Sequence, residues 1–207
     1  MVLLFISGLV FHELAEAVMG QAAITVLDVR IADWFNAHAA EPFTTIMYLI
    51  TYLHSVAGML VLLGLLAWHL RRQGARYWLL ALGFAVPGGM LLNVALKYYF
   101  QRARPVFEEP MVTLATYSFP SGHTTAATCF YGLMACYLVI ARPAWSVRLG
   151  TVIFCLTMIL LVAFSRVYLG AHYLSDVLAA MAESVAWLAV CITAISTLRR
   201  RREGKTL

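Results

Sequence analysis

The stretch "WLLALGFAVPGGMLLNVALKYYFQRARP", residues 78–105, joins a long apolar run to a cluster of cations. Residues 78–96 carry no charge, and they approach the roughly 20 residues that a helix needs to cross a bilayer. Lys97, Arg102 and Arg104 follow directly, with no acid among them. A membrane-edge anchor and an anion-binding site would both explain such a cluster. The rest of the sequence decides between these two interpretations.

The composition indicates a membrane protein. The chain has 207 residues, of which 62% are hydrophobic and 12% are charged, whereas soluble domains are nearer half apolar and a quarter charged. The net charge of +5 does not indicate a nucleic-acid partner, because the basic residues lie in short gaps between apolar runs. The four cysteines lack the spacing of a zinc or redox motif, and we interpret them as packing residues. They are Cys129, Cys136, Cys155 and Cys191.

Apolar runs define the spans. Five segments are long enough to cross a bilayer as helices, namely residues 44–69, 77–97, 120–141, 146–165 and 174–197. A sixth segment, residues 2–19, is weaker because it contains Glu13 and Glu16, and it is either a span or a helix that ends in the interface. We therefore expect an all-α integral membrane bundle of about six transmembrane helices, forming a single domain over residues 1–207.

Two further segments are not expected to span. Residues 21–42 mix charged and apolar residues and contain Trp34 and Phe35, a pattern typical of a helix that lies in the headgroup layer. Residues 199–207 are expected to form a basic cytoplasmic tail.

The cations divide unevenly between the two sides of such a bundle. If six spans alternate, ten of the fifteen Lys and Arg residues lie on one side, which the positive-inside rule assigns to the cytoplasm. These ten are Arg71, Arg72, Arg76, Arg142, Arg148, Arg199, Arg200, Arg201, Arg202 and Lys205. The other side holds Arg30, Lys97, Arg102, Arg104 and Arg166. Because most of these five gather in two short stretches, against the overall trend, we favour an anion site over a simple anchor.

Two more stretches fall on that same outer side. In "PSGH", Ser121 and Gly122 stand at the predicted start of a helix, where free N–H groups and the helix dipole favour an anion. In "SRVYLGAHYLSD", residues 165–176, His172 and Asp176 are four apart and share a helix face. A carboxylate so placed can hold one imidazole nitrogen protonated and leave the other as a nucleophile or base. His123 supplies a second imidazole.

Each of these features has a simpler explanation when it is taken alone. His123 could cap a helix, the His172–Asp176 pair could be an ordinary helical pair, and Arg166 could extend its charge to the interface. A zinc site built from the two histidines and the aspartate is also conceivable. Three cations directed at one place would repel a metal ion and attract an oxyanion, however, and all three stretches fall on one predicted face. We therefore favour a phosphate site.

These residues resemble the type 2 phosphatidic acid phosphatase superfamily of integral membrane lipid phosphate phosphatases. Its three motifs, KxxxxxxRP, PSGH and SRxxxxxHxxxD, correspond here to "KYYFQRARP", "PSGH" and "SRVYLGAHYLSD", with every defined position matched. The resemblance implies a bacterial enzyme that needs no metal or other cofactor. It also implies that the phosphoryl oxygens are bound by Lys97, Arg104, Ser121, Gly122 and Arg166. His172 would attack phosphorus, Asp176 would orient His172, and His123 would act as general acid and then base.

The motifs recognise a phosphate rather than a particular lipid. The expected substrate is a lipid phosphate or diphosphate, such as undecaprenyl diphosphate, phosphatidylglycerophosphate, phosphatidic acid or a lipid A phosphate, hydrolysed at the outer interface of the bacterial inner membrane. A lipid phosphotransferase or a membrane transporter remains as an alternative, whereas the related vanadium haloperoxidases are soluble. We expect a monomer or weak homo-oligomer with a cytoplasmic C-terminus. The roles of Arg102 and of the intramembrane acid Glu183 stay open.

Overall fold

The computed structural model describes residues 2–141 and 144–204, and within these ranges it contains helices and no strand. The helices are α1 (Val2–Met19), α2 (Ala23–Ala37), α3 (Phe43–Leu53), α4 (Val56–Arg72), α5 (Arg76–Phe100), α6 (Gly122–Ala141), α7 (Trp145–Tyr168) and α8 (Leu174–Glu203). The predicted all-α architecture is therefore confirmed.

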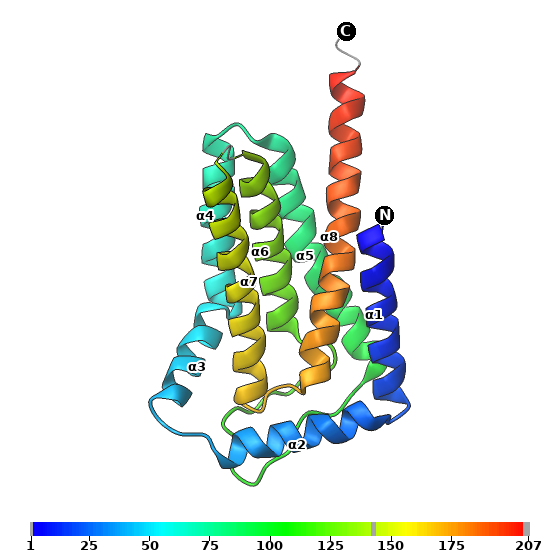
Figure 1. The fold of residues 1–207 in the computed structure, drawn as a ribbon, viewed down its shortest axis with the longest axis vertical. Coiled ribbons are helices and arrows are strands. Elements are labelled where there is room, and N and C mark those ends of the chain that lie inside the picture. The colour runs from blue at the N-terminus through cyan, green and yellow to red at the C-terminus, as the bar shows by residue number, and fades with distance from the viewer. Residues whose placement is uncertain (1, 142–143, 205–207) are drawn as a thin grey trace.

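The helices form an upright bundle with one helix lying across its lower end (Figure 1). The chain descends through α1, crosses below the bundle in α2, and rises through α3 and α4. It then descends, rises, descends and rises again through α5, α6, α7 and α8. Both termini therefore lie at one end, and the connections before α6 and before α8 lie at the other end, beside α2.

Five helices, α1, α5, α6, α7 and α8, are long and apolar enough to cross a membrane, and α3 with α4 forms a sixth, bent candidate. Large apolar side chains point outward along them, for example Phe5, Leu60, Phe84, Leu91 and Leu160. Such a surface suits lipid and not water. The chain is thus an integral membrane protein, and α2, with 15 residues, is not among the candidate spans.

The span predicted as one helix over residues 44–69 is broken, and this expectation needs correction. α3 and α4 meet at 56°. Ser55 has an extended backbone, and its hydroxyl accepts a hydrogen bond from the Gly58 N–H, so it caps α4. The preceding His54 is buried, with Nε2 2.9 Å from the Tyr131 hydroxyl. A cap and a buried imidazole thus interrupt a segment that hydropathy alone treats as continuous.

The described part of the basic segment predicted as a C-terminal tail is helical. α8 continues through Arg199, Arg200, Arg201 and Arg202 to Glu203 and projects beyond the other helices (Figure 1). Arginine is a good helix former, and cations at a helix C-terminus interact favourably with the helix dipole. The remainder of the predicted tail, residues 205–207, and Arg142 lie outside the described residues.

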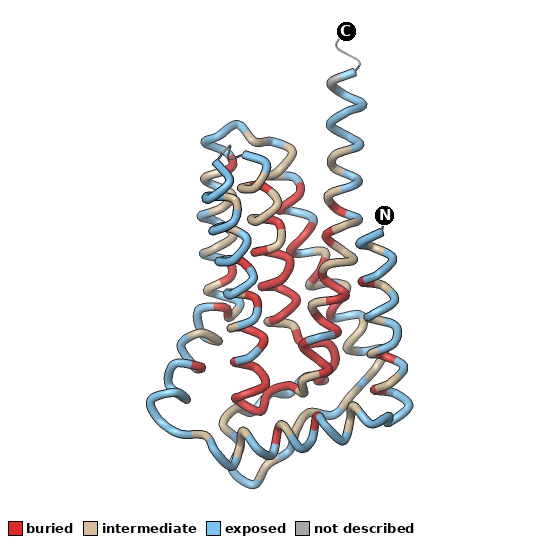
Figure 2. Tube along the Cα trace, viewed as in Figure 1, coloured by how far each residue is buried: buried red, intermediate tan, exposed pale blue. Residues whose placement is uncertain are grey.

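The core is centred on α6, and buried residues run along it and along the lower parts of α7 and α8 (Figure 2). Small residues allow α5 to approach its neighbours there. A Cβ added at Gly89 would lie 2.7 Å from the Cys129 sulfur and 3.3 Å from the Trp187 ring. The Trp187 indole N–H in turn donates to the Ala85 carbonyl at 3.0 Å. Gly89 therefore sets the spacing between α5, α6 and α8.

We predict that Gly89→Leu lowers the unfolding temperature of the protein, because overpacking a filled core costs about 1–3 kcal/mol. Gly83→Leu is the matched control, since Gly83 lies on the same helix with no atom within 4 Å of an added Cβ. Thermal unfolding in detergent micelles, followed by circular dichroism, measures both variants. Equal unfolding temperatures for the two variants would show that α5 is not closely packed at Gly89.

Candidate active site

The three stretches singled out in the sequence meet at the lower end of the bundle, where α5 leads into the 101–121 connection and α7 turns into α8 (Figure 1). Ser118, Ser121 and Asp176 are fully buried there, and Arg166 and His172 are each only 2% exposed. Polar side chains of this kind are rarely buried without partners. Their contacts therefore define the site.

His172 stands in the α7–α8 turn, and Asp176 lies in the first turn of α8. The His172 Nδ1 is 3.4 Å from the Asp176 Oδ2, and the Tyr173 N–H donates to the same oxygen at 2.9 Å. Because a carboxylate only accepts hydrogen bonds, we assign the proton of a neutral imidazole to Nδ1. The other nitrogen, Nε2, is then unprotonated and accepts a hydrogen bond from the Arg104 Nη1 at 3.2 Å.

Burial determines the charge of this imidazole. It lowers the pKa of His172 well below its ordinary value, and the nearby Lys97 and Arg104 act in the same direction, against the opposing effect of Asp176. His172 is therefore neutral at physiological pH. A neutral imidazole whose unprotonated nitrogen lies beside cations is suited to attack an electrophile that carries negative charge.

Lys97, Arg104 and Arg166 are held by oxygen atoms that carry no charge. The Lys97 Nζ donates to the Tyr117 carbonyl at 2.7 Å and to the Ser118 carbonyl at 3.2 Å. Arg104 donates to the Thr116 carbonyl at 2.6 Å and the Ala171 carbonyl at 2.5 Å.

Arg166 donates to the Thr51 hydroxyl at 3.1 Å, and its Nε is buried with no partner among the described residues. Among the described residues, no acidic side chain forms an ion pair within 4 Å with Lys97, Arg104 or Arg166. The three cations are thus fixed in position while their charge stays available to an anion.

The start of α6 supplies backbone donors beside this cluster. The Ser121 N–H, expected to contact an anion, donates instead to the Asp176 carbonyl at 3.1 Å, and the Ser121 hydroxyl accepts from Thr124 at 3.0 Å. Ser121 therefore ties α6 to α8. Gly122 begins the helix, and the N–H groups of the first helical turn have no partner within the helix. His123 follows it and interacts electrostatically with Arg166, Arg104 and Lys97.

Two residues important to this arrangement were not predicted as site residues. Arg102 donates to the Asp176 Oδ1 at 2.5 Å and to the Asp28 Oδ2 at 2.8 Å. Asp28, on α2, is fully buried and accepts the Ser175 N–H at 2.9 Å. Burial opposes the charge of Arg102, yet the two carboxylates outweigh it and raise the pKa of this guanidinium.

A partial signal for this pair was present in the sequence, because Asp28 is an acid on a mostly apolar helix and Arg102 lies within the first motif, at a position that the motif does not define. Their contact joins residues 74 positions apart, which no local pattern indicates. Ser118 was also missed, and its hydroxyl donates to the Asp176 Oδ2.

Among the described residues, no three His, Cys, Asp or Glu side chains are grouped so that they could hold a metal ion. The four cysteines are free thiols, three of them buried.

Comparisons with known proteins identify the family of the chain. Residues 76–200 match the PAP2 superfamily. The chain is 44% identical over 89 residues to phosphatidylglycerophosphatase B of Bacillus subtilis (strain 168), an alignment that covers 42% of this chain and 43% of that protein. The matched segment is thus less than half of the length of this curated relative.

Solved structures cover more of the chain. The crystal structure of a transmembrane PAP2 type phosphatidylglycerolphosphate phosphatase from Bacillus subtilis superimposes with a TM-score of 0.80 and 28% identity, covering 95% of this chain and 98% of that chain. Aquifex aeolicus LpxE superimposes with a TM-score of 0.65 and 19% identity, covering 81% of this chain and 95% of that chain. The second likeness concerns the fold alone.

We predict that Arg102→Gln destabilises the protein strongly, because it removes the charged partner of two buried carboxylates. Removing one member of a buried ion pair costs about 3–5 kcal/mol. Asp28→Asn is expected to be much milder, since an amide oxygen can still accept the Ser175 N–H and Arg102 keeps Asp176. Thermal unfolding of the purified variants tests the difference. Similar losses in both variants would contradict the assignment of Arg102 as the shared counter-ion.

Proposed function

Because this chain belongs to the PAP2 superfamily, we propose that it is a phosphatase that hydrolyses a phosphomonoester or diphosphate on a lipid headgroup. The observation that carries the proposal is the position of the His172 Nε2, which lies 3.2 Å from Arg104. A nitrogen nucleophile thus stands beside fixed cations whose charge no carboxylate within 4 Å neutralises, among the described residues. Phosphoryl transfer depends mainly on such positioning and charge stabilisation.

The named relatives support phosphatidylglycerophosphate as the substrate. The Bacillus subtilis relative and the Bacillus subtilis crystal structure are each named as a phosphatase of this lipid. Phosphatidic acid, undecaprenyl diphosphate and lipid A phosphates carry the same phosphoryl group and compete with it as candidates. We propose phosphatidylglycerophosphate as the preferred substrate of this chain.

In the first chemical step, Lys97, Arg104 and Arg166 bind the phosphoryl oxygens, with the Gly122 N–H as a further donor. The His172 Nε2 attacks phosphorus and forms a P–N bond, while the P–O bond to the lipid breaks. The departing oxygen takes a proton from the imidazolium of His123, which leaves a lipid alcohol and a phosphohistidine. The negative charge of the bound phosphate favours the protonated form of His123 before this step.

In the second step, a water molecule attacks the phosphohistidine. His123, now neutral, takes a proton from this water, and the new P–O bond forms as the P–N bond breaks. Inorganic phosphate leaves, His172 recovers its lone pair, and His123 is protonated again for the next cycle. Asp176 holds the Nδ1–H throughout and stabilises the positive charge that His172 acquires in the intermediate.

We predict that His172→Ala abolishes both phosphate release and the covalent phosphoenzyme. His123→Ala should slow phosphate release from a lipid by at least about a hundredfold, within the range of general acid catalysis. It should still form phosphoenzyme from p-nitrophenyl phosphate, whose leaving group needs no proton. Rapid quenching with radiolabelled substrate, followed by alkaline work-up, measures the intermediate, and His38→Ala, directly after α2, is the control.

Three outcomes would contradict these assignments. Labelling of His172→Ala but not of His123→Ala would reverse the nucleophile and the acid. Phosphate release by the wild type without any trapped label would indicate direct attack by water. Transfer of label to an added alcohol in preference to water would indicate a phosphotransferase.

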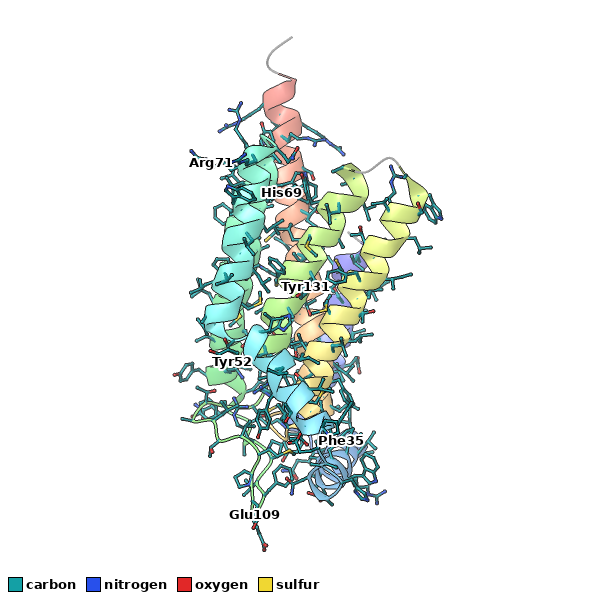
Figure 3. All side chains as sticks on the ribbon, turned by 90° about the vertical axis from the view of Figure 1, so that its left-hand side faces the viewer. Phe35, Tyr52, His69, Arg71, Glu109 and Tyr131 are labelled. Carbon is teal, nitrogen blue, oxygen red and sulfur yellow. The ribbon has the colours of Figure 1, made fainter. Side chains whose placement is uncertain are left out.

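We further propose that the site faces the periplasm or exterior of the bacterial inner membrane. His69 and Arg71 lie at one end of the bundle, while Phe35 and Glu109 lie at the other, with the site (Figure 3). Arg72, Arg76 and the arginines that end α8 share the first end. By the positive-inside rule, that end belongs in the cytoplasm.

A pair of single cysteines tests this orientation, in a background in which the four native cysteines are replaced. Glu109→Cys should react with an impermeant maleimide in spheroplasts, and Gln73→Cys should react only after the membrane is permeabilised. Both positions are exposed, so accessibility to the protein surface does not bias the comparison. The reverse pattern of labelling would place the site in the cytoplasm.

A further inference from the structure

Glu183 is an acid that the proposed chemistry does not use. It lies on α8, is 4% exposed, and neither of its carboxyl oxygens has a hydrogen-bond partner among the described residues. Seven residues separate it from Asp176, which places it about 10 Å farther along the helix, away from the site end. A buried carboxylate without a partner is costly, whereas a carboxylic acid can donate one hydrogen bond and accept others.

The Glu183 side chain lines a groove of about 270 Å³ between α1, α5 and α8. α1 contributes Leu4 and Phe11, and α5 contributes Leu92 and Leu96. The acid is thus the one titratable group in an otherwise apolar lining. The size and lining suit a hydrocarbon chain that carries a polar atom at one point.

Asn93 lies between Glu183 and the phosphate site. This residue lies one turn before Lys97 on α5, is fully buried, and donates to the Pro120 carbonyl at 3.3 Å. Its Oδ1 has no partner among the described residues and lies 3.4 Å from a Cβ added at Gly122. The Glu183 carboxyl lies near the Asn93 side chain, although no hydrogen bond of ordinary geometry joins them, and it interacts through its charge with Lys97. Unpaired polar atoms therefore extend from the start of α6 to the groove.

We propose that this groove holds one acyl chain of a glycerolipid substrate and that Glu183 donates a hydrogen bond to its ester carbonyl. The inference rests on the proposed phosphatase function and deepens it, because it names the part of the lipid that the enzyme recognises. With the headgroup phosphate among Lys97, Arg104 and Arg166, the ester carbonyls of a glycerolipid lie deeper in the bilayer, on the side of the site where Glu183 stands.

This contact distinguishes two classes of lipid phosphate. A glycerolipid supplies an acceptor at the depth of Glu183, whereas a polyprenyl phosphate supplies only hydrocarbon there. Glu183 is already unpaired among the described residues of the free protein, and a polyprenyl chain in the groove would leave it so and gain nothing from it, whereas a glycerolipid gains a hydrogen bond. Glu183 therefore selects for glycerolipids.

The test compares phosphatidylglycerophosphate carrying ester-linked chains with its ether-linked analogue, which lacks the carbonyls, and with farnesyl diphosphate. We expect wild-type kcat/KM to be about tenfold higher for the ester than for the ether lipid, the effect of one lost hydrogen bond to a buried partner. Glu183→Leu should remove that preference, mainly through KM, and leave farnesyl diphosphate hydrolysis within about twofold. Glu183→Gln retains a donor and should keep most of the preference.

Glu13→Leu is the matched control, because Glu13 lines a different groove, between α1 and α8. It should leave the ester preference unchanged. Equal rates for ester and ether lipids in the wild type, or an equal loss on all three substrates in Glu183→Leu, would overturn the proposal.

A binding measurement separates this inference from the proposed function. Phosphatidylglycerol, the product lipid, should raise the unfolding temperature of the wild type more than its ether analogue does, and Glu183→Leu should abolish this difference. The measurement requires no turnover. Ester-dependent stabilisation without any phosphate release would refute the phosphatase function alone. Lipid hydrolysis without ester-dependent stabilisation would refute the groove assignment alone.

Discussion

The buried carboxylate of Asp176 is the contact on which the rest of the site depends. Its Oδ1 accepts from Arg102, its Oδ2 accepts from Ser118 and from the Tyr173 N–H, and its carbonyl accepts the Ser121 N–H. One residue thus joins the connection before α6, the start of α6 and the start of α8. Because the carboxylate is fully buried, it requires these donors, and meeting that requirement brings the separate stretches to one place.

Charge in the site is divided between structure and catalysis. Asp28 and Asp176 share Arg102, so the two acids and one of the cations serve mainly to position the chain. Lys97 and Arg104 are held by backbone carbonyls, and Arg166 is held by a threonine hydroxyl. Neutral acceptors fix these side chains without cancelling their charge. This arrangement leaves a preorganised positive field beside the neutral His172, which is what a phosphoryl group needs.

The two acids of α8 illustrate how burial separates roles on one helix. Asp176 is surrounded by donors, whereas the carboxyl oxygens of Glu183 have no partner among the described residues. The first acid completes the protein's own network. The second faces an apolar groove, and in our proposal its partner is supplied by the lipid. In this proposal, the enzyme binds the phosphate beside the start of α8 and the lipid backbone about two turns farther along the same helix.

The sequence by itself determined the all-α class, the number of candidate spans and the clustering of the three motif stretches. Each follows from local quantities: the length of an apolar run, the spacing of residues along a helix, and the charge of each gap. The tertiary structure alone decided where the span breaks, at His54 and Ser55. It also decided that the Ser121 N–H donates to the Asp176 carbonyl and that Asp28 is buried against Arg102. These contacts join residues distant in sequence, and whether a polar group is costly or stabilising depends on the partners that folding places beside it.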